Sequence, residues 1–111
     1  MRLEREKLLL AQIRRSAEDA SIFVERMDLG DFLDDRRTQQ AVAMSLLIMG
    51  ENVSKLMKKH PEFVAKYPDV PWTSVVGMRN RIAHGYTDID FRIVWSTLNE
   101  SVPELLRKLP K

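Results

Sequence analysis

Cysteine is absent from this sequence of 111 residues. Its absence excludes disulfide bonds and thiolate metal ligands, and it fits a reducing compartment. A long hydrophobic run is also missing, because the most apolar stretch, residues 41–49, is about half of the ~20 residues that a membrane-spanning helix needs. Residues 1–6 are rich in charge and show no apolar signal-peptide region. We therefore expect a cytoplasmic protein without a membrane span.

Glycine and proline are scarce, with 4 and 5 copies. The abundant Leu, Ala, Glu, Lys, Arg and Met residues favour helix. Hydrophobic residues make up 44% and charged residues 31% of the chain, and the length predicts a single domain over residues 1–111. A net charge of +2 and a pI near 9.1 permit contact with RNA without by themselves indicating it.

Apolar residues recur at helical spacing along most of the chain. No segment alternates with period two over the length of a strand, and Gly30 is predicted to end the first helix. These patterns predict an all-α, up-down bundle of four main helices plus a short C-terminal helix. The predicted main helices cover residues 3–27, from 35 or 38 to 59, 72–84, and from 88 or 90 to 99, and the short helix covers 101–109.

A few positions carry further expectations. Glu6 interrupts the apolar stripe of the first helix. Gly50 lowers the helix propensity of the second helix. A glycine at this position would allow the backbone of a neighbouring helix to approach closely. That second helix is apolar nearly all round, which predicts a place in the middle of the domain. His60, before Pro61 at a helix end, is expected to be exposed, and Ile93 is expected to face inward.

Residues 77–86 concentrate polar side chains in a segment that otherwise resembles core helix. Arg79 falls in the apolar stripe of the third predicted helix, where a guanidinium is costly to bury unless it is paired or meets an anion. A salt bridge, with Glu51 as a candidate partner, and a bound phosphate are both open explanations. His84 near the helix end either interacts with the helix dipole or exchanges a proton near neutral pH. Tyr86 is either a packing aromatic or an accessible hydroxyl.

An arginine and a histidine together are suited to RNA cleavage. A 2′-hydroxyl attacks the neighbouring phosphate once its proton is removed and the added charge is stabilised. Asn80 and His84 share one helix face, but Arg79 and His84 point about 140° apart on one ideal helix. We therefore expect a homodimer with a site near its two-fold axis. Two histidines and no cysteine offer no metal cage, so neither a metal nor a cofactor is predicted.

A longer set of residues carries a family resemblance. Gly50-Glu51, Val70-Pro71-Trp72, Gly77-Met78-Arg79-Asn80, His84-Gly85-Tyr86 and Val94-Trp95 occur in this order. The chain with this set resembles the HepT-like branch of the HEPN superfamily, small all-helical toxins of prokaryotic toxin–antitoxin pairs, over nearly its whole length. The resemblance implies a dimeric helical fold and a metal-independent endoribonuclease. It also implies that Arg79 and His84 are catalytic, with Asn80 supporting them and Glu51 holding Arg79.

The same resemblance implies a protein partner. HepT-like proteins are usually paired with an MntA-like minimal nucleotidyltransferase that acts as antitoxin. In that family the tyrosine at the place of Tyr86 can receive AMP from ATP. Added AMP would place bulk and negative charge beside Arg79 and His84.

Two other classes of function stay open from the sequence. One is a non-catalytic helical subunit that docks a nucleotidyltransferase, and the other is a module that binds a mononucleotide phosphate through Arg79. Trp72 and Trp95 are expected to anchor the core or a dimer interface. Several cations are expected to be solvated and are candidates to line an RNA path, namely Lys55, Lys58, Lys59, Arg81 and Arg92.

Overall fold

Every regular element of the computed structural model, which describes residues 2–111, is helical. This confirms the predicted all-α bundle. The order along the chain is α1 (Arg2–Phe23), α2 (Leu29–Leu33), α3 (Arg36–Lys59), α4 (Pro61–Ala65), α5 (Trp72–Gly85), a 3-10 helix η1 (Tyr86–Asp88), α6 (Phe91–Asn99) and α7 (Ser101–Lys108).

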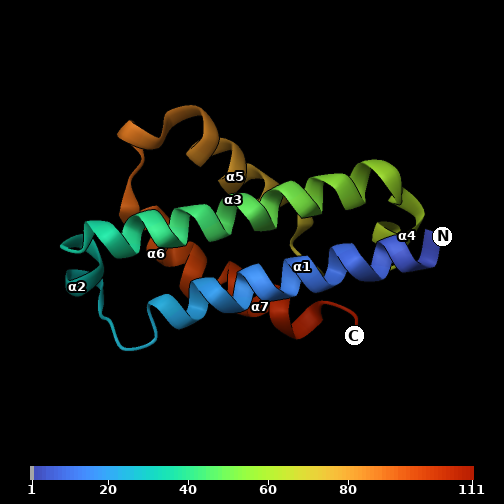
Figure 1. Cartoon of the computed structure of the whole chain (residues 1–111), viewed down its shortest axis with the longest axis horizontal. Helices are drawn as coiled ribbons and strands as arrows, with labels where there is room; N and C mark the ends of the chain where they lie inside the picture. Colours follow the sequence, from blue (N-terminus) through green and yellow to red (C-terminus); the bar gives the residue numbers. More distant parts are fainter. Residues whose placement is uncertain (1) are drawn as a thin grey trace.

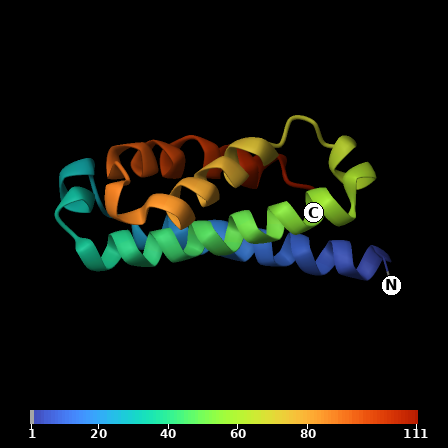
Figure 2. The same ribbon diagram turned by 90° about the horizontal axis from the view of Figure 1, so that it is seen from above.

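The helices form two layers in an elongated molecule of 44 × 27 × 21 Å. The two longest helices, α1 and α3, run antiparallel and side by side in one layer (Figure 1). The second layer contains α5, α6 and α7, and α5 lies obliquely across α3 (Figure 2). Helix α5 therefore has α3 beneath it, and this contact positions the polar segment that it carries.

Aspartates define where three of the helices begin. Asp35 caps α3 by accepting hydrogen bonds from the backbone N–H of Thr38 at 3.0 Å and from its hydroxyl at 2.8 Å. These two hydrogen bonds hold the pKa of Asp35 below its ordinary value. Asp90 caps α6 by accepting a hydrogen bond from the backbone N–H of Arg92 at 2.9 Å. Asp28 forms a capping box at α2, so the prediction that Gly30 stops a helix was wrong: Gly30 lies inside α2.

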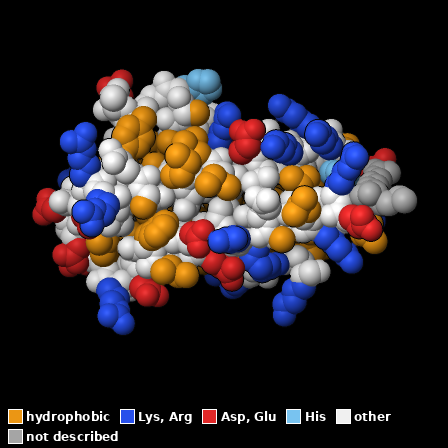
Figure 3. All heavy atoms as spheres, in the orientation of Figure 1, with side chains coloured by type: hydrophobic (Ala, Val, Ile, Leu, Met, Phe, Trp, Pro, Cys, Tyr) orange, Lys and Arg blue, Asp and Glu red, His pale blue; other side chains and the backbone are white. Residues whose placement is uncertain are grey.

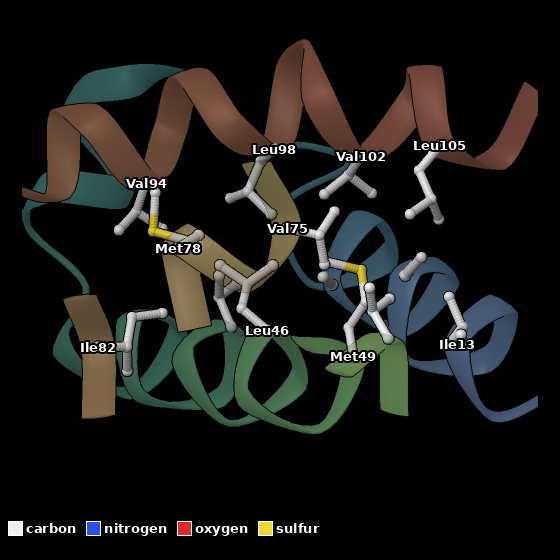
Figure 4. Close-up of a cluster of buried hydrophobic side chains, with 14 of the residues drawn as sticks. Ile13, Leu46, Met49, Val75, Met78, Ile82, Val94, Leu98, Val102 and Leu105 are labelled. Carbon is white, nitrogen blue, oxygen red and sulfur yellow. The ribbon is translucent and has the colours of Figure 1, made fainter. Parts of the chain in front are cut away.

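The core lies between the two layers and follows the predicted apolar stripes. Ile13, Val42, Leu46, Met49 and Leu56 are fully buried on the facing sides of α1 and α3. Side chains from the second layer meet them there (Figure 4). These are Val75, Met78 and Ile82 of α5, Val94 and Leu98 of α6, and Val102 and Leu105 of α7.

Helix α3 lies in the middle of the domain, as predicted, because it contacts α1, α2, α4 and α5, although its Met44 and Ile48 remain 57% and 42% exposed. Two expectations about burial were wrong. Ile93 does not face inward and is 42% exposed. His60 is buried instead of exposed, and its Nδ1 lies 3.2 Å from a carboxylate oxygen of Glu6. The charge that interrupts the α1 stripe thus meets a histidine at the end of α3.

None of the helices within residues 2–111 combines the length and the apolar character that crossing a bilayer requires.

Candidate functional site

Arg79 reaches the surface because of an unusually close helix crossing. Gly50 of α3 lies directly beneath α5, where an added Cβ would be 2.8 Å from Cγ of Arg79, closer still to its Cβ, and 3.3 Å from the carbonyl oxygen of Val75. Only a residue without a side chain permits this approach. The close contact expected at Gly50 is therefore present, and it is the side chain of Arg79 that fills the space.

The guanidinium of Arg79 is held by two neighbours. Its Nη2 donates to Oε2 of Glu51 at 3.1 Å, and its Nη1 donates to Oδ1 of Asn80 at 3.0 Å. The Arg79 and Glu51 side chains are 32% and 50% exposed. An ion pair this exposed contributes roughly 0–1 kcal/mol to stability. The pair therefore orients the guanidinium without preventing it from exchanging partners.

His84 lies on another side of α5. It borders a groove at the corner between α5 and α6, together with Arg81, Asp88 and Ile93. Its imidazole is exposed and makes no hydrogen bond or ion pair with the residues described here, 2–111. Within one chain the structure therefore joins Arg79 to Asn80 and Glu51, but it does not bring His84 into contact with Arg79.

Tyr86 begins the 3-10 helix that follows Gly85. Its ring packs edge-on against Phe91, with centroids 5.8 Å apart and ring planes at 78°. The side chain is half-buried, and its hydroxyl makes no hydrogen bond to the described part of the chain. Tyr86 is therefore both a packing aromatic and a residue with an unengaged polar end.

Sequence reasoning missed Asp88, which shares the groove of His84. Lys55, which the sequence offered as a candidate for an RNA path, shares a groove on α3 with Glu51. Trp72 is buried, as predicted, and its Nε1 donates to the carbonyl oxygen of Tyr67 at 2.9 Å.

Within residues 2–111 no three His, Asp or Glu side chains gather as a metal-binding group would require. Helix α5 and the turn that follows it carry one oriented guanidinium, one amide, one exposed imidazole and one phenol.

Comparison with known proteins gives a consistent assignment. Residues 13–111 match the HepT-like family, described as "Ribonuclease HepT-like". The chain is 32% identical over 103 residues to "Putative RNase MJ0127" of Methanocaldococcus jannaschii, covering 93% of this chain and 83% of that protein. It is 32% identical over 102 residues to "Probable ribonuclease HepT" of Thermococcus cleftensis, covering 92% and 90%. No solved structure matches the chain significantly.

Proposed function

The chain belongs to the HepT-like ribonuclease family, and from that premise we propose that it is a metal-independent endoribonuclease toxin. The observation that carries the proposal is the presentation of Arg79: it is seated on Gly50, oriented by Glu51 and Asn80, and still open to solvent. A charged fork in this position is ready to receive a phosphate in place of a weakly held carboxylate.

The proposed reaction is transfer within the RNA. His84 takes the proton of a 2′-hydroxyl, the 2′-oxygen forms a bond to the adjacent phosphorus, and the bond to the 5′-oxygen breaks. The leaving 5′-oxygen takes up the proton that His84 accepted, directly or through water, so the products are a 2′,3′-cyclic phosphate and a 5′-hydroxyl end. Arg79 stabilises the charge on the phosphoryl oxygens and Asn80 orients the group. Both reacting oxygens come from the RNA itself, which is why no metal is proposed.

A homodimer completes the site in this proposal. Arg79 and His84 do not meet within one chain, so a second copy related by a two-fold axis would bring one chain's His84 toward the other's Arg79. An exposed apolar area supports this arrangement. Figure 3 shows orange side chains gathered over the N-terminal half of α3 and the adjoining part of α5. Met44 and Ile48 are the large exposed apolar side chains of α3.

We also propose that an MntA-like nucleotidyltransferase restrains the toxin by modifying Tyr86. The phenol oxygen of Tyr86 would attack the α-phosphorus of ATP, forming a phosphodiester to AMP and releasing pyrophosphate. The new group would add negative charge on the segment that carries His84. An intact-mass increment matching AMP, mapped to Tyr86 after co-production with the enzyme, supports this step, and an unmodified tyrosine under the same conditions contradicts it.

The test of the ribonuclease is cleavage of a labelled RNA by purified protein with and without EDTA. We expect activity to survive the chelator. Arg79→Ala and His84→Ala should each lower the rate by about 10²-fold or more, while circular dichroism shows unchanged helicity. If wild-type protein leaves RNA intact but still binds the nucleotidyltransferase after His84→Ala, the chain is a non-catalytic interaction subunit and the ribonuclease proposal fails.

A further inference from the structure

The C-terminal half of α3 carries a concentration of positive charge. Lys55, Lys58 and Lys59 are all exposed, and none of them forms an ion pair within the described residues 2–111. Glu51 is the only acidic residue between positions 51 and 60. Figure 3 shows blue side chains gathered over this end of the helix, beyond the apolar area on its other half.

These lysines continue from the Arg79 site. Lys55 and Glu51 line one shallow groove on α3, and Glu51 is the residue that holds Arg79. The steps from Glu51 to Lys55 and from Lys55 to Lys59 are four residues each, or about 6 Å along the helix axis. A spacing of this size is comparable with the separation of neighbouring phosphates on an extended nucleic-acid strand.

The helix dipole accounts for the position of two of these three lysines. Lys58 and Lys59 lie in the last turn of α3, where cations interact favourably with the negative end of the helix dipole. That effect falls off within the last turn, so it does not explain Lys55. Lys55 lies one turn from Glu51 and forms no ion pair within residues 2–111, so its ammonium group is available to an anion from outside the chain.

We propose that Lys55, Lys58 and Lys59 form a track that holds the backbone of single-stranded RNA as it leads away from Arg79. This inference rests on the proposed ribonuclease function and adds the form and the direction of its substrate. Double-stranded-RNA-binding domains span roughly 16 base pairs and contact two successive minor grooves, whereas this track is a short run along one helix. Lysines act on phosphates as point charges and carry no base preference, so the track holds any sequence.

The test is the salt dependence of RNA binding, measured by fluorescence anisotropy with a labelled single-stranded oligonucleotide. All proteins carry His84→Ala so that the probe stays intact. The track variant is Lys55→Gln with Lys59→Gln. For single strands the slope of log K against log salt is about −0.7 per phosphate contact, so loss of two contacts should make the slope less steep by about 1.4.

The matched control is Arg107→Gln with Lys108→Gln, which removes the same charge from α7 in the other layer. A change of slope in the track variant and not in the control supports the track, and equal slopes in both overturn it. Equal affinity of the parent protein for a duplex of the same sequence overturns the single-strand assignment. Cleavage by the protein with intact His84 is measured separately, so failure of the ribonuclease proposal is distinguished from failure of the track.

Discussion

Replacing Gly50 with alanine probes the link between the helix crossing and the site. The added methyl group would lie within 2.8 Å of Cγ of Arg79 and nearer to its Cβ. Carbon atoms in contact are normally about 3.5–4.0 Å apart. The Cβ of Arg79 is fixed to the backbone of α5 and cannot turn aside, so α5 must move outward by about 1 Å or more.

The change in stability should be small because two terms oppose each other. Alanine is favoured over glycine in a helix interior by about 1 kcal/mol, whereas overpacking of a close contact costs about 1–3 kcal/mol. The expected net loss is therefore at most about 2 kcal/mol. The change in activity should be large, because a displacement of about 1 Å from the reactive arrangement can lower a rate by about 10²-fold.

The assay pairs thermal unfolding with single-turnover cleavage of labelled RNA. The matched control is Gly77→Ala on α5, where an added Cβ meets nothing within 4 Å. That variant should gain up to about 1 kcal/mol in stability and cleave at the parent rate. Equal rates of RNA cleavage by Gly50→Ala and Gly77→Ala would show that the close contact between Gly50 and Arg79 does not position the guanidinium for cleavage.

Three further substitutions test other parts of the structure. Glu51→Gln should change stability by less than about 1 kcal/mol yet slow cleavage, because the guanidinium of Arg79 loses the charge that orients it; an unchanged rate in a stopped time course contradicts this. Ile48→Glu should convert the proposed dimer to monomer in sedimentation analysis and abolish cleavage, and a persistent dimer would place the interface elsewhere. Glu6→Ala removes the charged neighbour of buried His60 and should lower the free energy of unfolding by about 1–3 kcal/mol, measured in urea.

Much of the fold could be predicted because local signals agree with the tertiary structure. Helix α3 was placed within one or two residues of its ends, since Asp35 offers a cap and Pro61 follows its last turn. The pairing of Arg79 with Glu51 could be named as a candidate because an arginine in an apolar stripe needs an anion. The position of Glu51 after Gly50 and the family resemblance, which marks Glu51, supported that choice.

The remaining features depend on which helices face each other, and periodicity in one segment does not contain that information. Ile48 and Ile93 belong to apolar patterns, yet each remains 42% exposed in the folded chain. His60 and Glu6 are far apart in the sequence, so nothing local indicated that they meet. The relation of His84 to Arg79 was predicted to need two chains, and that prediction awaits the test of the dimer.

The weak hold of Glu51 on Arg79 bears on how the activity of the proposed ribonuclease is restrained. An interaction worth about 1 kcal/mol is open roughly one sixth of the time at room temperature, so an incoming ligand loses less than a factor of ten in affinity by waiting for the free guanidinium. The ion pair with Glu51 is therefore too weak to keep a ligand away from Arg79. If it is a toxin, its silence has to be imposed by another molecule and maintained continuously.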